Sequence, residues 1–193
     1  GDWMKDSAST PARQPIAPGS FTLGGHRLEL VRYHGHTADD LVLHNVPDLA
    51  DVRTMLKLLE GMGVKVTRSG TDVTLNAGNV TSTKAPYELV KTMRASFYVL
   101  GPLVARFGRC RVSLPGGCAW GPRPVDLHLK GLEALGAKVN VTHGYVEALC
   151  DGRLPGGKFD FPISSVGATV NVLMAATLAQ GTSVLSNAAI EPE

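Results

Sequence analysis

Hydrophobic positions along this chain switch between the spacing of a strand, every second residue, and that of an amphipathic helix, every third or fourth. A first series of elements is predicted in this order: a strand at 41–46, a helix at 49–62, strands at 64–68 and 72–76, and a long helix from about 86 to 106. A second series follows: a strand at 110–114, a helix at 124–135, strands at 137–141 and 145–149, and a helix at 166–180. Strands that alternate with helices in this way predict an α/β fold in which helices pack on sheets.

The two series are copies of one pattern. The stretch from Leu59 to Val66 matches the stretch from Leu132 to Val139 at an offset of 73 residues. Three pairs of landmarks keep this offset: Gly63 with Gly136, Val73 with Val146, and Gly108 with Gly181. We therefore predict repeats over about 41–109 and 110–181, with a third repeat begun at 182.

The first 40 residues follow a different pattern. Residues 1–20 are rich in Pro, Ser and Ala and have no hydrophobic period, which indicates a flexible lead. In the atypical segment 21–40, strand-like runs at 21–23 and 27–32 are joined by Gly24-Gly25. This spacing predicts a β-hairpin.

Composition narrows the class of function. The 193 residues include 19 Lys and Arg against 17 Asp and Glu, with a formal net charge of +2 and no dense basic run, so nucleic-acid binding has no support. No apolar run approaches the ~20 residues of a membrane span and no signal-peptide pattern is present, so we expect a cytoplasmic protein without a membrane partner. Cys110, Cys118 and Cys150 lack a Cys-x-x-Cys spacing and predict neither a disulfide framework nor a zinc site.

The stretch from Ser113 to His128 is the first candidate for chemistry. A loop rich in Gly and Pro precedes a predicted helix that opens at Pro124, where the missing amide proton costs little. Cys118 and Arg123 are then expected near a helix N-terminus, which attracts anions and lowers the pKa of a thiol. The alternative is a glycine-rich turn whose cysteine is only a small buried apolar residue.

Five motifs carry a family resemblance. They are Ala85–Ser96, Leu114–Ala119, Arg123–His128, Ser165–Thr169 and Asn187–Glu193. With these motifs, residues 41–193 closely resemble the UDP-N-acetylglucosamine enolpyruvyl transferases. The resemblance implies the inside-out α/β barrel-type domain of that family, built from βαβαββ repeats, with two repeats and the start of a third in this chain.

The resemblance also implies an activity and its substrates. Enzymes of this family transfer the enolpyruvyl group of phosphoenolpyruvate to the 3-hydroxyl of UDP-N-acetylglucosamine and release phosphate. This is a step in peptidoglycan precursor synthesis, and it implies a role in cell-wall formation and thereby in cell shape and division. No metal or organic cofactor is expected.

By the same resemblance, roles fall on individual residues. Cys118 stands where the family has its catalytic cysteine, the general acid that fosfomycin alkylates. Arg94 and Arg123 match arginines that contact substrate. The segment 123–127 matches the segment that binds the uridine part, and the turn 165–167 matches the turn that meets the diphosphate. The substrate-binding candidates are Arg94, Arg123, Pro124, Val125, Asp126, Leu127, Ile163, Ser164, Ser165, Val166 and Gly167. The simpler alternatives are surface ion pairs for the arginines and a helix cap for Ser165.

Some features depart from the family pattern. No Lys-Asn dipeptide, which the family uses to hold phosphoenolpyruvate, occurs in the chain. One alternative is therefore a catalytically inactive fragment or chimera that only binds the nucleotide sugar, with a missing second domain or third repeat supplied by another chain. Residues 21–42 resemble a metallo-β-lactamase-fold segment through His36, so a metal-dependent hydrolase is a further alternative. One histidine does not make a zinc site, because zinc needs three or four converging ligands.

Overall fold

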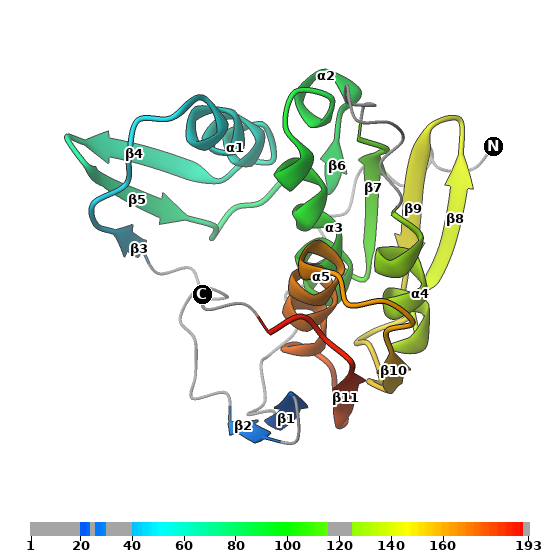
Figure 1. Ribbon diagram of the computed structural model, residues 1–193. Coiled ribbons are helices and arrows are strands. Elements are labelled where there is room, and N and C mark those ends of the chain that lie inside the picture. Colours follow the sequence, from blue (N-terminus) through cyan, green and yellow to red (C-terminus); the bar gives the residue numbers. More distant parts are fainter. Residues whose placement is uncertain (1–19, 24–25, 30–39, 116–124, 191–193) are drawn as a thin grey trace.

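The computed structural model describes residues 20–23, 26–29, 40–115 and 125–190. The strands are β1 (Ser20–Leu23), β2 (His26–Glu29), β3 (Asp40–Leu43), β4 (Lys65–Ser69), β5 (Asp72–Asn76), β6 (Lys84–Ala85), β7 (Arg109–Ser113), β8 (Lys138–Thr142), β9 (Tyr145–Leu149), β10 (Lys158–Asp160) and β11 (Ser183–Ser186). The helices are α1 (Ala50–Gly61), α2 (Tyr87–Val90), the 3-10 helix η3 (Arg94–Val99), α3 (Leu100–Phe107), α4 (Asp126–Ala134) and α5 (Val166–Ala176). Helices α3 and α5 lie at the centre, and the sheets lie around them (Figure 1).

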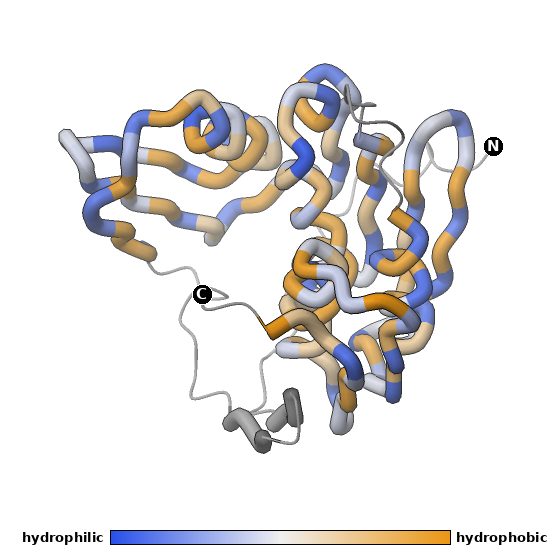
Figure 2. The backbone as a smooth tube through the Cα atoms, in the orientation of Figure 1, coloured by the Kyte–Doolittle hydropathy of each residue, from blue (hydrophilic) through white to orange (hydrophobic). Residues whose placement is uncertain are grey.

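Two of the sheets share one arrangement. The first unit (β3, α1, β4 and β5) has the strand order β3-β5-β4, and the second unit (β7, α4, β8 and β9) has the order β7-β9-β8 within a sheet that β6 extends. The registers agree at the 73-residue offset, because Val66 lies opposite Leu75 and Val139 lies opposite Ala148. Hydrophobic and polar residues alternate along the strands of both units (Figure 2). The division of the chain into repeats at 109 and 181 stays a prediction.

Helix α1 and helix α4 end in the same way. Gly63 and Gly136 follow them with φ of 95° and 100°, a left-handed backbone that suits glycine at the end of a helix. A Cβ would lie 2.7 Å from the carbonyl oxygen of Asn79 at the first position and 2.4 Å from Cγ of Pro155 at the second. Glycine is therefore needed at both exits for its backbone and for its lack of a side chain.

The long helix predicted from 86 to 106 is wrong, because the chain breaks there into α2, η3 and α3. Helix α2 ends at Val90, and Met93, the N-cap of η3, is extended with φ −146° and ψ 121°. In one continuous helix, Pro102 would have no N–H to donate a hydrogen bond to the carbonyl of Tyr98, and its ring would clash with that carbonyl. With the α-helix starting at Leu100, Pro102 falls in the first turn, where no such bond is needed.

Helices α3 and α5 pack at very close range. A Cβ at Gly101 would lie 2.3 Å from the carbonyl oxygen of Asn171, so only glycine allows this approach. The fully buried side chains around this contact form one core, and its largest members are Phe97, Phe161, Leu58, Leu100, Leu132, Leu135 and Leu154. The core thus forms around helices rather than between two sheets.

The third sheet has the order β10-β11-β1-β2. Strand β10 runs parallel to β11, as β6 runs parallel to β7 in the second unit. Strands β1 and β2 pair antiparallel, and β1 adds to β11 in parallel. The hairpin segment over 21–40 stays a prediction. Short strands β6 and β10 were not predicted from the hydrophobic pattern. At the 73-residue offset, residues 20–29 correspond to 93–102, most of which are helical.

Candidate functional site

Three candidate residues lie outside the described residues. They are Cys118, Arg123 and Pro124. The segment that contains them joins β7 to α4, so both of its neighbours are known. On one side is Pro115, and on the other is Val125, the N-cap residue of α4.

The other candidates gather at the starts of three helices. Arg94 is the first residue of η3 and is exposed. Asp126 and Leu127 form the first turn of α4. The turn of candidates that begins at Ile163 and ends at Gly167 leads into α5, with Ser165 at its N-cap.

These three helix starts meet around one side chain, His128 of α4. A Cβ at Gly167 would lie 3.5 Å from Cε1 of His128 and 3.0 Å from the hydroxyl of Tyr98 in η3. Arg94 and Asp126 both act electrostatically on the His128 ring. The structure therefore brings Arg94, the first turn of α4 and the first turn of α5 together.

The N-terminus of α5 is capped and open to solvent. The Ser165 hydroxyl accepts a hydrogen bond from the amide of Ala168 at 3.5 Å, so the predicted helix cap is present. Ile163 is 72% exposed and Val166 is 44% exposed, which leaves the approach to the first turn uncovered by any described residue. An N-terminus in this condition can present amides and partial positive charge to an anion.

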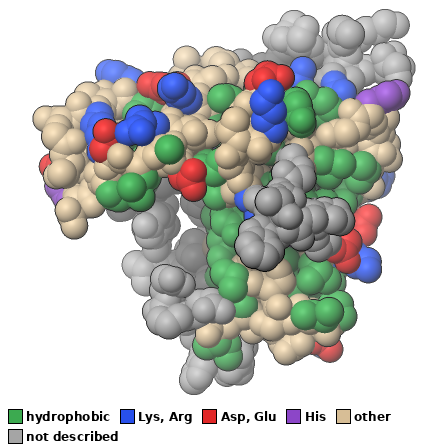
Figure 3. All heavy atoms as spheres, turned by 45° about the horizontal axis from the view of Figure 1, so that its top comes forward, with side chains coloured by type: hydrophobic (Ala, Val, Ile, Leu, Met, Phe, Trp, Pro, Cys, Tyr) green, Lys and Arg blue, Asp and Glu red, His purple; other side chains and the backbone are tan. Residues whose placement is uncertain are grey.

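Charge on the described surface is mixed. Figure 3 shows basic and acidic side chains standing next to one another over the end of the molecule that carries α1 and β4. The guanidinium of Arg94 makes no hydrogen bond or ion pair with another described residue.

Burial makes the two described cysteines poor nucleophiles. Burial raises the pKa of the Cys110 thiol to about 12, and this cysteine is fully buried. Burial, together with the nearby Asp151 carboxylate, also raises the pKa of Cys150. Neither thiol is activated, since the thiolate is the reactive form.

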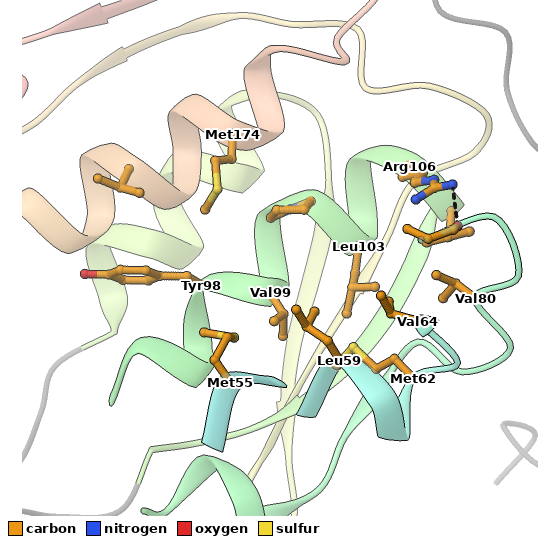
Figure 4. Close-up of a pocket in the computed structure, with 14 residues that line it drawn as sticks. Met55, Leu59, Met62, Val64, Val80, Tyr98, Val99, Leu103, Arg106 and Met174 are labelled. Atoms are coloured by element: carbon orange, nitrogen blue, oxygen red, sulfur yellow. Dashed lines mark hydrogen bonds between the residues drawn. The ribbon is translucent and has the colours of Figure 1, made fainter. Parts of the chain in front are cut away.

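A separate apolar groove runs between α1, α3 and α5. It encloses about 400 Å³, and Met55, Leu59, Met62, Leu103 and Met174 point into it (Figure 4). Arg106 lies at one end, where its guanidinium donates to the carbonyl of Ala77 at 3.0 Å. No predicted site residue lines this groove, but Tyr98 belongs to its lining and also contacts the His128 ring of the candidate site.

The described residues hold no group of three or more His, Cys, Asp or Glu side chains that could bind a metal ion. His36, the residue behind the predicted hydrolase alternative, lies outside them. Within the same residues, none of the helices has the length and hydropathy needed to cross a membrane.

Sequence reasoning missed two residues of this site, His128 and Asn171. His128 is the last residue of the motif that begins at Arg123, and its place in that motif is the signal that could have identified it. Asn171 lies 43 residues away in the sequence, and its side chain meets the ring of His128 only in the folded chain. It lies in the mostly apolar helix α5, and the hydrophobic pattern of this stretch gives no reason to single it out.

Comparison with solved structures gives the fold. The chain is similar to the enolpyruvyl transferase NikO from Streptomyces tendae, with a TM-score of 0.69 and 20% identity, over 81% of this chain and 37% of that one. It is also similar to EPSP synthase from Acinetobacter baumannii, with a TM-score of 0.59 and 22% identity, over 81% and 36% of the two chains. The predicted α/β fold of the enolpyruvyl transferases is confirmed.

Comparison of sequences gives the family. The chain is 57% identical over 152 residues to the UDP-N-acetylglucosamine 1-carboxyvinyltransferase of Prosthecochloris aestuarii, and 58% identical over 153 residues to that of Psychrobacter arcticus. Each match covers 78% of this chain and 36% of the relative, so the chain spans a little over a third of the length of these relatives. The comparisons do not support the predicted chimera. Residues 37–193 match the family of EPSP synthase (3-phosphoshikimate 1-carboxyvinyltransferase), and the chain therefore belongs to this family of enolpyruvyl transferases.

Proposed function

We propose that this chain is part of a UDP-N-acetylglucosamine 1-carboxyvinyltransferase, which transfers enolpyruvyl from phosphoenolpyruvate to the 3-hydroxyl of UDP-N-acetylglucosamine. The observation that carries this proposal is the 57% identity over 152 residues to a relative of that name. The proposed setting is the cytoplasm, where the product feeds peptidoglycan synthesis and so supports cell shape and division.

The chemistry of the site residues suits this reaction. Its substrates carry a diphosphate, a phosphate and a carboxylate, and its intermediate gathers negative charge. Arginine side chains bind phosphate and carboxylate through paired N–H donors. Amide N–H groups at the start of a helix also stabilise negative charge, because the positive ends of their dipoles point at it in a fixed position. In the proposal, Arg94 and Arg123 contact the anionic groups and the first turns of α4 and α5 receive the nucleotide diphosphate.

The proton for the reaction comes from Cys118 in this proposal. Addition of the sugar hydroxyl to phosphoenolpyruvate requires a proton at the methylene carbon, and a thiol with a lowered pKa can supply it. Cys110 and Cys150 cannot take this role, since burial holds their protons more tightly. Neither a metal nor an organic cofactor takes part, so turnover is expected to survive EDTA.

A second candidate is a fragment that binds UDP-N-acetylglucosamine without turnover. It is favoured by the absence of a Lys-Asn dipeptide from this sequence. In that case a missing repeat or second domain, supplied by another chain, is needed to complete the cleft.

Labelling with fosfomycin tests the thiol. We expect one adduct at Cys118 by mass mapping, with Cys110 and Cys150 unlabelled in the folded chain. The Cys118→Ser variant is expected to take up no label, while Cys150→Ser is expected to label as the parent does. Equal labelling of all three cysteines would show that the thiol at 118 is not activated.

Two measurements separate the two candidate functions. Calorimetric titration with UDP-N-acetylglucosamine measures binding, and phosphate release in the presence of phosphoenolpyruvate measures turnover. Binding with phosphate release supports the transferase, whereas binding alone supports the second candidate. Absence of binding would overturn both.

A further inference from the structure

The side-chain amide of Asn171 has a fixed orientation. The amide N–H of Gly101 points at its Oδ1 at 2.8 Å, and since an N–H can only donate, this atom must be the oxygen. The opposite end of the side chain is therefore the NH₂ group. It donates to the carbonyl of Phe97 at 3.4 Å and faces Nδ1 of His128 at 3.0 Å.

This orientation fixes the tautomer of His128. A nitrogen that faces the Asn171 NH₂ group must accept, so Nδ1 carries no proton. The ring is neutral and its N–H lies on Nε2. Protonation would place two donors face to face, and the hydrogen bond would be lost.

The rest of the His128 ring is held by aromatic contacts. Its centroid lies 5.3 Å from that of Phe97 in an edge-on arrangement and 6.3 Å from that of Tyr98 in a stacked one. Only 3% of the residue is exposed. Together with the hydrogen bond to Asn171, these two ring contacts hold the ring in one orientation.

Every partner of His128 belongs to an element that carries a substrate-binding candidate. The ring comes from the first turn of α4, two residues after Asp126. Phe97 and Tyr98 belong to η3, which begins at Arg94. Asn171 belongs to α5, whose first turn holds Gly167.

We propose that His128 is a positioning residue. Its neutral ring joins α4 to α5 through Asn171 and to η3 through Phe97 and Tyr98, and it thereby holds the nucleotide-sugar contacts at the starts of these helices in one arrangement. The proposal rests on the proposed function for its ligand. The bond to Asn171 sets the spacing between α4 and α5, and the aromatic contacts set the position of η3 against both.

Charged groups on the neighbouring elements agree with a neutral ring. Burial is the main reason why the pKa of His128 falls to about 4, and the Arg94 guanidinium on η3 lowers it further. Asp126 on α4 opposes this shift. From α5, the partner is the uncharged Asn171. The ring therefore keeps its acceptor nitrogen at neutral pH.

The first test needs no variant. Long-range ¹H–¹⁵N spectra of the full chain report which nitrogen of each imidazole carries the proton. We expect Nε2 to be protonated and Nδ1 to be bare at His128 at pH 7. A proton on Nδ1, or a doubly protonated ring, would overturn the proposal.

The second test compares three substitutions by calorimetric titration with UDP-N-acetylglucosamine. His128→Phe keeps a ring between Phe97 and Tyr98 but removes the acceptor, and it is expected to weaken binding about tenfold. His128→Asn returns an acceptor oxygen near the place of Nδ1, and its affinity is expected within about threefold of the parent. The matched control is His44→Asn, at an exposed histidine of the first unit, which is expected to change nothing.

Hydrogen exchange reports on the positioning directly. In His128→Phe, amides at 125–129 and 165–169 are expected to exchange faster, whereas those of β4 and β5 stay as in the parent. Parent-like exchange and affinity in His128→Phe would overturn the proposal. If the parent chain binds no UDP-N-acetylglucosamine, the proposed function fails, and the tautomer and the exchange rates still decide the role of His128.

Discussion

The first and second units share their strands and register, but their helices meet different neighbours. Helix α4 packs on α5 closely enough that a Cβ at Gly131 would lie 2.3 Å from Cγ2 of Val172. At the 73-residue offset, α1 has Leu58 in the place of Gly131 and Met55 in the place of His128. Met55 faces an apolar groove instead of a polar partner.

The partner residues differ in the same way. Asn171 of α5 corresponds at this offset to Tyr98 of η3. The pair His128 and Asn171 thus corresponds to Met55 and Tyr98, both of which line the groove. The connection that follows the first strand is also twice as long in the second unit, at 114–125 against 44–49. The candidate site therefore lies beside the unit with the longer connection, where α4 and α5 share the buried polar pair.

The largest expected effect on stability is that of placing in α4 the leucine that α1 has at the matching position. Gly131→Leu places a large side chain where Val172 already lies, and we expect it to lower the free energy of unfolding by about 3 kcal/mol or more. Denaturant unfolding followed by circular dichroism measures the loss. The control is Gly61→Ala, at a glycine of α1 with open space around it, which is expected to be neutral or to stabilise by up to about 1 kcal/mol. A tolerated leucine at 131 would mean that α4 and α5 are not closely packed.

The next effect concerns pH. His128 has a pKa of about 4 in the folded chain against 6.5 as its ordinary value, so the unfolded chain binds the extra proton between these pH values. Stability should therefore be full above pH 6.5 and fall as the pH is lowered toward 4, by up to about 3 kcal/mol from this one residue. His128→Met, which copies the first unit, is expected to remove this dependence. It should also cost about 1–3 kcal/mol at pH 7, because the Asn171 donor loses its acceptor.

The measurement is a series of denaturant unfolding curves between pH 4 and pH 7 on the parent and on His128→Met. Parallel pH profiles for the parent and His128→Met would contradict a neutral buried ring.

The smallest effect lies in the two β-turns. His143 has φ 50° in the turn from β8 to β9, at the position that corresponds to Gly70, with φ 60°, in the turn from β4 to β5. His143→Gly relieves a left-handed backbone and is expected to stabilise by up to about 1 kcal/mol, reduced by the added freedom of the unfolded chain. Gly70→Ala, where no neighbouring atom lies within 4 Å, is expected to cost about 1 kcal/mol from backbone strain alone. Thermal unfolding of both variants checks the pair, and equal shifts of the same sign would show that the two turns are not equivalent.

Regular elements with a clear period were predictable from the sequence. Helix α1 and the strand pairs β4–β5 and β8–β9 lie within about one residue of their predicted bounds, because their hydrophobic faces are repeated without interruption. The break before α3 was missed because the apolar spacing continues through Pro102, whose ring rather than its polarity decides the outcome. Strand β10 was missed for another reason, since three residues that form a strand by pairing with β11 leave no period to detect.

The candidate site was predicted from the resemblance rather than from local pattern. Motif residues at Arg94, Asp126 and Ser165 could be named in advance, and the structure places all three at helix starts. Their spatial meeting at His128 could not be predicted, because it depends on how closely α3 and α5 approach at Gly101. The role of Cys118 stays a prediction, since it lies outside the described residues.

The groove beside α1 has one more consequence, which follows from its methionines. Met55 and Met174 are partly buried, and each side chain has three rotatable bonds. The lining can therefore adapt to apolar ligands of different shape. Conversion of these sulfur atoms to sulfoxides would make the same lining polar and chiral. Oxidation of these methionines would therefore change how readily water wets the groove.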